Sequence, residues 1–531
     1  SSADRNTTNA KLAIQLGSDS QLTIIGNAFK TTAQDPLGLS LTAINSGSQA
    51  AGYNANAWNS VKSVEQNQGG FEFSKKISPE ETIKLVGYYG QRNQEQYQAA
   101  GLTTKLYPAS NGTSGTGQAA YSSVAINGVG TGNGSFVPAT NVLYSGGLLT
   151  LDRSYYGFDA QGQKSFNFLG FQSKAILGAS YDRSADKSMS YCTSIASGSV
   201  LTAGCTGPLT TAVNANANYG AYAFDQYAQL QTFLSDRFTW GLGLRHANVT
   251  LTASDNVSGA FNRDRTYSAI LPMTSISYSL NPQTNIYTSV GRGLDTPTLN
   301  QIKYTCGNIA CTAAPLTTPN FLDASITNQV EIGIKQKLPG IAYWSVALFQ
   351  AESYKEIMSL ANVAGKNVYT NANHTQRKGI EWFGLIEMPN NFRSTISYTY
   401  LLSKVTDTYQ SASSITAGSY IPGVPRQKFF ADIAWRKPDQ SIDIGLEMIA
   451  SSGLYANDLN TAGSEGYTIF NLRAGLKQKY KSLTLTEFVR VNNFTDKYYV
   501  GSVIVNQKDS QFYEPAPGRN WIIGARANYN F

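Results

Sequence analysis

The eight residues FNLRAGLK at positions 470–477 alternate between apolar and polar or small side chains. Phe470, Leu472, Ala474 and Leu476 make up the apolar set. Because successive side chains of a β-strand point to opposite faces, this spacing places the four apolar side chains on one face and Arg473 with its polar neighbours on the other. The stretch therefore predicts a strand that lies between an apolar and a polar environment.

The same alternation recurs along the whole chain. It is clear at 238–245, 441–448 and 523–531, and we count about nineteen such segments. Short turns separate some of them, at 17–20, 77–80, 339–341, 437–440 and 481–482. Long connections rich in Gly, Ser, Asn and Thr separate others, at about 32–60, 99–147, 191–216, 305–325, 410–420 and 500–518. Alternating short and long connections are typical of an antiparallel meander that has turns at one end and loops at the other.

Composition excludes several other classes of protein. Charged residues make up 14% of the 531 residues, against about 25% in an average soluble domain, and the chain lacks the Ala/Glu/Lys/Leu/Arg content of a coiled coil. No stretch approaches the roughly 18 apolar residues of a membrane-spanning helix. The 41% hydrophobic content and 11% aromatic content exceed those of disordered chains. The net charge of +7 comes without a Lys/Arg cluster, so we expect no nucleic-acid partner.

The two faces of the strands favour a transmembrane antiparallel β-barrel over a soluble β-sandwich. A sandwich packs Val, Ile and Leu in a dry core, whereas here Ala, Gly and aromatic residues occupy the apolar face and Arg, Asn, Gln and Glu the polar one. Lipid tolerates any apolar side chain, and a wet lumen tolerates charge. Tyrosines near strand ends suit interfacial girdles; they are Tyr88, Tyr89, Tyr155, Tyr156, Tyr498 and Tyr499.

The four cysteines form two close pairs in Gly/Ser/Thr/Ala-rich loops. We predict two local disulfides in an oxidising compartment, Cys192 with Cys205 and Cys306 with Cys311, although three connectivities are possible. Neither spacing suits zinc, and neither His246 nor His374 is nearby, so we expect no metal. His246 continues the apolar register of 238–245, which indicates a girdle or rim position.

Several motifs resemble the TonB-dependent outer-membrane receptors. They are NNFTDKYY (492–499), PGR (517–519), IPGVPR (421–426) and RKGIE (377–381). A second group resembles the branch of these receptors that imports pyrroloquinoline quinone: DPLGL (35–39), QNQGG (66–70), TPTLN (296–300), VGSVIVN (500–506) and YEPAPGRN (513–520). The matches extend from about residue 9 to the end of the chain.

The resemblance implies a barrel of the 22-stranded type in the bacterial outer membrane, plugged by an N-terminal domain that a TonB-contacting box precedes. No plug or box is visible in this sequence, so residues 1–531 correspond to the barrel domain. A barrel with both termini in the periplasm needs an even number of strands. We therefore expect roughly three strands to be missing and the chain to be part of a longer receptor, whose TonB partner acts through the missing region. Outer-membrane lipid and lipopolysaccharide are expected to surround it.

Binding is the chemistry that the residues support, and no motif indicates an enzyme or a cofactor. Pyrroloquinoline quinone is a planar tricarboxylate, so its site needs cationic or amide donors and an aromatic ring. The stretch QRNQEQY (91–97) offers Arg92, Gln96 and Tyr97. Arg292 and Tyr304 flank TPTLN, and Arg377 belongs to RKGIE, where its alternative role is a charge pair with Glu381.

Three classes of function remain open. The first is a TonB-energised receptor for a scarce small molecule, with pyrroloquinoline quinone as the first choice and a ferric siderophore as the alternative. The second is a passive, porin-like channel. The third is a soluble β-rich binding protein.

Overall fold

The computed structural model describes residues 3–34, 38–47, 61–104, 143–196, 199–201, 213–257, 259, 261–304, 320–363, 366–411, 413–507 and 510–530. At 97–104, 143–147, 192–196, 199–201, 213–214 and 363 it describes the backbone alone.

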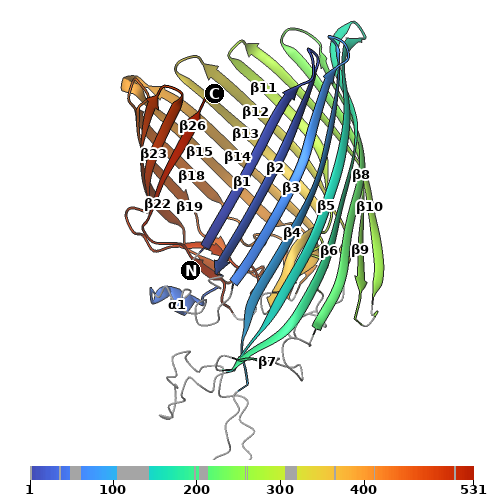
Figure 1. The fold of residues 1–531 in the computed structure, drawn as a ribbon, viewed down its shortest axis with the longest axis vertical. Coiled ribbons are helices and arrows are strands. Elements are labelled where there is room, and N and C mark those ends of the chain that lie inside the picture. The colour runs from blue at the N-terminus through green and yellow to red at the C-terminus, as the bar shows by residue number, and fades with distance from the viewer. Residues whose placement is uncertain are drawn as a thin grey trace, which may run out of the picture.

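One antiparallel sheet of twenty strands curves around an open bore (Figure 1). Nineteen of these strands are long, because β7 (Ser199–Leu201) is a three-residue extension beside β6. The long strands are β1 (Ala3–Gln15), β2 (Ser20–Gln34), β3 (Val61–Lys76), β4 (Glu81–Thr104), β5 (Leu143–Phe168), β6 (Phe171–Ala196), β8 (Val213–Phe233), β9 (Phe238–Asp255), β10 (Asn262–Asn281), β11 (Thr284–Asp295), β12 (Ser325–Leu338), β13 (Ala342–Val363), β14 (Lys366–Met388), β15 (Phe392–Val405), β18 (Gln427–Arg436), β19 (Ile442–Ser451), β22 (Tyr467–Tyr480), β23 (Leu483–Asn492) and β26 (Asn520–Tyr529). The predicted all-β architecture and the predicted number of strands are confirmed.

The remaining elements are short and belong to the connections. They are β16 (Tyr409–Gln410), β17 (Ser414–Ile415), β20 (Leu454–Tyr455), β21 (Gly463–Ser464), β24 (Val500–Val503), β25 (Tyr513–Pro515), the helix α1 (Leu41–Asn45) and the 3-10 turn η2 (Pro389–Asn391). Among the described residues, no helix has the length and apolarity to cross a membrane.

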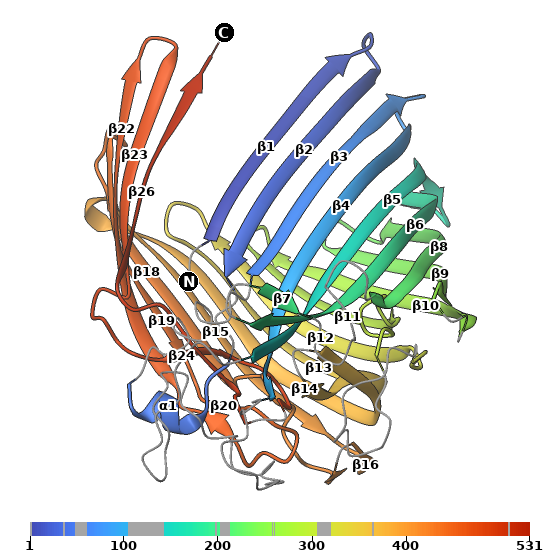
Figure 2. The same ribbon diagram turned by 60° about the horizontal axis from the view of Figure 1, so that its bottom comes forward.

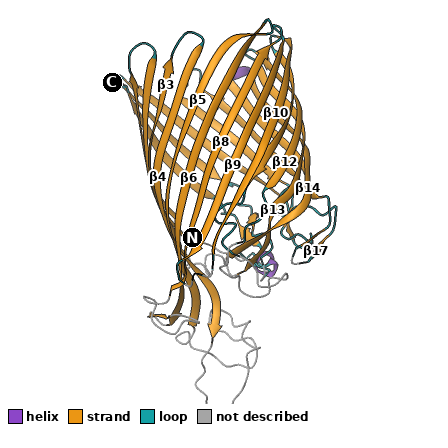
Figure 3. Cartoon of the chain, turned by 90° about the vertical axis from the view of Figure 1, so that its right-hand side faces the viewer, coloured by secondary structure: helices purple, strands orange, loops and turns teal. Residues whose placement is uncertain are grey.

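Tight turns and long connections lie at opposite ends of the sheet, as the sequence predicted (Figure 3). The turn between β5 and β6 consists of Leu169 and Gly170, both with positive φ (51° and 85°). Two such residues match the right-handed twist of the flanking strands. The short strands β16, β20 and β24 and the helix α1 lie at the loop end (Figure 2), whereas η2 forms the turn between β14 and β15 at the opposite end.

The two faces of the sheet differ in chemistry. Long polar side chains of one face reach side chains two strands away, as Tyr88 of β4 reaches Asp182 of β6. Side chains converge in this way only on the concave face, so this face lines the bore. On the convex face, Leu446 and Leu472 lie directly opposite each other on β19 and β22, and 38% and 41% of their surface is exposed. The apolar face is therefore not packed in a dry interior, which excludes the sandwich.

Alternation also divides the tyrosine pairs that we expected in the girdles. Tyr89 and Tyr156 lie on the convex face and are exposed. Tyr88 and Tyr155 lie on the concave face, where their ring centroids are 6.3 Å apart. The girdle prediction is thus wrong for Tyr88 and Tyr155, because adjacent residues of a strand cannot both face lipid. His246 does lie on the convex face, between Gln226 and Ser268 of the neighbouring strands.

The sheet has two edges. Among the described residues, β1 pairs with β2 alone and β26 pairs with β23 alone, and Figure 2 shows the two edge strands apart. Both run from the loop end to the turn end, since the chain passes from β1 into the turn at 16–19 and β26 begins where the long 493–519 connection ends. A direct pairing of β1 with β26 would therefore be parallel, in a sheet that is otherwise antiparallel.

Candidate functional site

A row of charged residues crosses the concave face near the loop end. The strand register places Arg92 of β4 opposite Arg153 of β5, Arg153 opposite Asp186 of β6, and Asp186 opposite Tyr219 of β8. Arg153 binds the Asp186 carboxylate with two hydrogen bonds of 2.7 Å, from Nε and Nη2. Asp186 is 2% exposed. This bidentate geometry satisfies the carboxylate and fixes the guanidinium.

Arg92 has no such carboxylate partner within the part of the chain that the structure describes. Its Nε is buried and has no hydrogen-bond partner among the described residues. The side chain directly opposite, Arg153, carries the same charge, and like charges in opposed strand positions are destabilising. The wall thus holds a cation that its immediate neighbours do not neutralise.

Lys303 brings a third cation to this row. It is 4% exposed, and its Nζ lies 5.4 Å from the centre of the Tyr219 ring. Burial lowers the pKa of the Lys303 ammonium to about 8; the Asp186 carboxylate raises it, and the Arg153 guanidinium lowers it. Lys303 has no carboxylate within salt-bridge distance among the described residues.

The segment that carries Lys303 folds against the inner wall because of the TPTLN motif. Leu299 and Ile302 are 5% and 0% exposed and pack in one cluster with Tyr219, Leu251 and Tyr267. Gln301 Oε1 accepts a hydrogen bond of 2.8 Å from the backbone N of Thr298, which closes the turn. The motif therefore acts as an apolar anchor that delivers the next residue, Lys303, to the charged row.

These four groups, which we call the cationic row, are Arg92, Arg153, Lys303 and Asp186. With Lys303 protonated, these three cations and one carboxylate together carry a net charge of +2. Buried charges are costly unless an opposite charge accompanies them. The arrangement is suited to an anion that enters from the bore, because guanidinium groups bind carboxylates with paired hydrogen bonds.

The structure places the predicted site residues in different positions. Arg92 belongs to the cationic row, and Gln96 lies four residues farther along the same face of β4, opposite Leu149. The backbone of Tyr97 is in β4, and its side chain lies outside the described part of the chain. Tyr304 packs beside Ala361 and Val368, with Lys366 Nζ 5.4 Å from its ring centre. Burial raises the pKa of Tyr304, so its hydroxyl stays neutral.

Two of the predicted residues stand apart from the row. Arg292 shares the convex face of β11 with Val290 and donates to Asn328 Oδ1 at 3.0 Å. Arg377 is held by Glu356, through hydrogen bonds of 2.8 and 2.6 Å. The sequence suggested a charge pair with Glu381 as the alternative role of Arg377. Arg377 does form a charge pair, but its partner is Glu356 of the neighbouring strand β13.

The predicted disulfides involve residues outside the described part of the chain. Cys205, Cys306 and Cys311 lie outside the described residues, and Cys192 is described by its backbone alone. The two disulfides stay a prediction.

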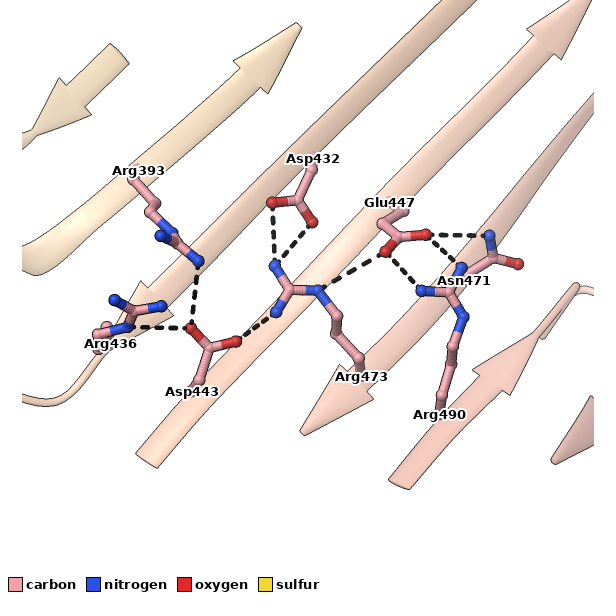
Figure 4. A network of polar contacts seen from close by, with 8 residues as sticks. All are labelled: Arg393, Asp432, Arg436, Asp443, Glu447, Asn471, Arg473 and Arg490. Atoms are coloured by element: carbon pink, nitrogen blue, oxygen red, sulfur yellow. Dashed lines mark hydrogen bonds and ion pairs between the residues drawn. The ribbon is translucent and has the colours of Figure 1, made fainter. Parts of the chain in front are cut away.

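A second charged network covers the concave face near the turn end (Figure 4). Arg473 of β22 lies at its centre, bound to both carboxylate oxygens of Asp432 at 3.0 Å and also to Asp443. Glu447 links Arg473, at 3.6 Å, to Arg490, at 2.6 Å. Arg393, Arg436 and Asn471 complete the network, and its charges are paired, so its role here is to brace β15, β18, β19, β22 and β23.

Three of the motifs quoted from the sequence meet in a loop clasp, defined here as Gly38, Leu39, Ile504 and Tyr513. Leu39 N donates to Tyr513 O at 2.7 Å and Tyr513 N donates to Leu39 O at 3.1 Å. A Cβ on Gly38 would lie 2.0 Å from Gln511 O and 3.0 Å from Ile504 Cδ1, so only glycine fits. The clasp joins the connection after β2 to the connection before β26, at opposite edges of the sheet.

Comparison with known proteins agrees with this architecture. The family model described as TonB dependent receptor-like, beta-barrel matches residues 10–494. The fold is similar to the ferric yersiniabactin uptake receptor FyuA from Yersinia pestis, with a TM-score of 0.69 and 13% identity over 100% of this chain and 71% of FyuA. It is also similar to the siderophore receptor PiuA from Acinetobacter baumannii (TM-score 0.71, 14% identity, 99% of this chain and 74% of PiuA). The ferric citrate transporter FecA gives a TM-score of 0.71 at 13% identity, over 99% of this chain and 70% of FecA.

The chain belongs to the TonB-dependent receptor-like β-barrel family. It is a β-barrel receptor of the bacterial outer membrane, in a family that performs transport and not catalysis. At identities near 14%, the structural matches define the fold and leave the ligand to be inferred from the site.

Proposed function

We propose that this receptor imports an anionic ferric siderophore and that the cationic row forms part of its binding site. The observation that carries the proposal is the net charge of +2 on the four groups of the cationic row, of which Lys303 and Asp186 are buried. In addition, the buried Nε atom of Arg92 has no hydrogen-bond partner among the described residues. A ferric chelate that retains carboxylate or phenolate oxygens would supply the opposite charge. Receptors for ferric chelates are prominent among the similar structures, which supports this ligand over others.

Pyrroloquinoline quinone is the second candidate. The motifs that resemble its receptors support it, and three of them form the loop clasp rather than scattered surface loops. A planar tricarboxylate would also match the cationic row. Gln96 would add a donor on the β4 side of the site.

We further propose that a plug domain, a TonB box and further strands precede the barrel in the intact receptor. Two unpaired edges support this part of the proposal, because hydrocarbon cannot hydrogen-bond the free backbone groups of a sheet edge. Three added strands would convert nineteen into an even number and replace a parallel closure by antiparallel pairing.

Uptake by cells tests the function. The whole gene product would be expressed in a strain without its own receptors, and uptake of iron-55 siderophores and of pyrroloquinoline quinone would be measured with and without TonB. We expect saturable, TonB-dependent uptake of a ferric siderophore. TonB-dependent uptake of the quinone alone would select the second candidate, and uptake of both without TonB would indicate a passive channel and contradict the proposal.

A further inference from the structure

A hollow of about 340 Å³ lies on the convex face of β15, β18, β19 and β22. Two of the residues that line it are small, Ala450 and Thr468, which lie opposite each other on β19 and β22. Two are aromatic, Tyr398 and Phe429, which form a cross-strand pair of β15 and β18. Ala450 shares its face of β19 with the exposed Leu446, an even number of positions away, so the hollow belongs to the face that meets lipid.

The hollow lies at the outer boundary of the apolar band. β18 has ten residues, and at about 3.3 Å per residue with a tilt of about 40° it spans only ~25 Å, the height of that band. Ile433 of β18, which is exposed, therefore lies within the band, and Gln427, which lines the hollow, lies at its loop-side boundary. Since the long loops of such barrels are extracellular, this boundary belongs to the outer leaflet.

A lysine lies at one side of the hollow, where the NNFTDKYY motif holds it. Lys497 is exposed and lines the hollow. Asn493, which is 1% exposed, fixes the backbone of Lys497 on both sides: its Oδ1 accepts from Lys497 N at 2.9 Å, and its Nδ2 donates to Lys497 O at 2.8 Å. The adjacent carboxylate, Asp496, pairs with Arg519 instead, at 3.6 Å.

Two more cations lie at the β15 side of the hollow, around the ring of Tyr420. Lys404 Nζ is 4.6 Å and Arg426 Cζ is 4.9 Å from the centre of this ring. A backbone bridge to Lys404 and two hydrogen bonds with Asn460, of 2.7 and 2.8 Å, hold Tyr420 in place. Lys404 shares the convex face of β15 with Tyr398, again an even number of positions away. Arg426 is the last residue of the IPGVPR motif.

Carboxylates do not neutralise these three cations. Within the described residues, no salt bridge joins Lys404, Arg426 or Lys497 to an acidic side chain. Glu352 of β13 lies on the same convex face, but it accepts hydrogen bonds from Gln350 and Gln376, at 2.8 and 3.2 Å. Unpaired cations at the edge of the apolar band are suited to anionic lipid head groups, and guanidinium and ammonium groups both bind phosphate.

We propose that this surface binds a phosphorylated glycolipid of the outer leaflet. An acyl chain occupies the hollow against Tyr398 and Phe429, and phosphate groups accept from Lys497 on one side and from Lys404 and Arg426 on the other. β15 and β22 are three strand spacings apart, ~14 Å, so the two sides are suited to two separate phosphates. Because the surface faces away from the bore and excludes the edge strands β1 and β26, neither a plug nor added strands would cover it, and the inference goes beyond the proposed transport function.

Native mass spectrometry of the whole receptor tests the proposal. The receptor is delipidated in a mild detergent, and EDTA removes divalent cations that could bridge phosphate to carboxylates. The probes are bisphosphorylated lipid A, monophosphorylated lipid A and phosphatidylglycerol, and the spectra give the number of lipids bound and their affinities. Heat-modified electrophoretic mobility confirms that each variant is folded.

Three variants separate the contributions. Arg426→Met with Lys497→Met removes one cation from each side of the hollow and leaves Lys404 beside Tyr420. Ala450→Leu fills the hollow without changing the charge. Arg292→Met is the matched control, because it removes an exposed arginine from the convex face near the loop end of β11, four strands from β15.

We expect one tightly bound lipid A, with affinity reduced about tenfold or more in the Arg426/Lys497 double variant, as for the loss of a hydrogen bond to a charged group. Ala450→Leu should also weaken binding, and Arg292→Met should leave it unchanged. Monophosphorylated lipid A should bind more weakly than the bisphosphorylated form, and phosphatidylglycerol more weakly still. Equal lipid A affinity in the wild type and the double variant would overturn the proposal, as would an equal loss in Arg292→Met, which would indicate a general effect of surface charge.

Discussion

Arg92 and Arg153 lie directly opposite each other on β4 and β5, two arginines in one cross-strand pair on the wall of the bore. Of these two arginines, only Arg153 has a carboxylate partner among the described residues, namely Asp186. Opposed like charges cost the folded state about 0.2–1 kcal/mol. An arrangement that costs stability and is not relieved by a local partner is expected at a binding site, where a ligand supplies the missing charge.

The first prediction concerns the stability of the unliganded receptor. Replacing Arg92 with methionine removes the repulsion and keeps a long side chain, so Arg92→Met should unfold at the same or a higher temperature than the wild type. Heat-modified electrophoretic mobility measures this. Arg153→Met, which leaves the buried Asp186 unpaired, should lower the free energy of unfolding by about 3–5 kcal/mol. Equal destabilisation by both changes would show that Arg92 is a structural residue.

The second prediction concerns pH. The pKa of Lys303 is lowered to about 8 in the fold, so this group loses its charge as the pH rises through 8. Affinity for an anionic ligand should therefore fall between pH 7 and 9. The unliganded receptor should become more stable between pH 8 and 10.5, because the unfolded chain then binds more protons than the folded chain.

Lys303→Met provides the control for this pH dependence. The variant should bind the ligand weakly at pH 7 and should lose the decline in affinity across pH 8. A decline that persists in Lys303→Met would assign the pH dependence to another group, such as the ligand itself.

The third prediction concerns the tyrosines of the concave face. A Cβ on Gly178 of β6 would lie 2.3 Å from the ring of Tyr227, whose hydroxyl donates to Asp159 at 3.1 Å. Gly178→Ala should therefore cost about 1–3 kcal/mol through overpacking. Gly162→Ala on β5 is the matched control, since nothing lies within 4 Å of its Cβ. Unfolding in urea compares the two, and an equal effect of both substitutions would contradict the packing argument.

The fourth prediction concerns the network in Figure 4. Arg473 joins Asp432, Asp443 and Glu447. Arg473→Met leaves these carboxylates with fewer cations and should destabilise the barrel by about 3–5 kcal/mol. Arg473→Lys should recover part of the loss, because lysine restores the charge without the paired hydrogen bonds. Since the network lies near the turn end, ligand affinity at pH 7 should change less than twofold in the lysine variant.

Local pattern was sufficient to predict the strands, the turns and the two faces. Leu446 opposite Leu472 follows from period-two alternation in each strand, and alternation holds whatever the strand pairs with. The same rule separates Tyr88 from Tyr89, which we had placed together in a girdle. Proximity to a strand end does not decide which face a residue occupies.

The cationic row could be predicted only in part. Arg92 was identified from its own segment, but Arg153 lies opposite it because β4 and β5 pair in one register across a long connection, and register is not encoded in either strand alone. Lys303 was missed because its position depends on the packing of Leu299 and Ile302 against β8, β9 and β10. The sequence did contain one signal that could have identified Lys303: this residue lies between the TPTLN motif and Tyr304, which was itself selected as a site residue.

Arg292 and Arg377 show what a motif alone does not specify. Each was chosen as an arginine near a motif, yet alternation places Arg292 on the convex face, and Glu356 engages Arg377 from the next strand. A motif gives the position of a residue in the sequence. Whether the charge is free to bind a ligand depends on which neighbours the fold brings to it.

Calorimetric titration of the whole receptor at pH 7 is the most direct measurement, with the anion that the uptake assay selects as the ligand. It would compare the wild type with the Arg92→Met/Lys303→Met double variant and with Arg526→Met, which removes a guanidinium on the concave face of β26, remote from the cationic row. Hydrogen bonds to charged groups contribute about 1.5–3 kcal/mol each, so the double variant should bind at least 100-fold more weakly, roughly the loss of two such contacts or more, while Arg526→Met binds like the wild type. A double variant that binds as tightly as the wild type would contradict the assignment of the cationic row as the ligand site.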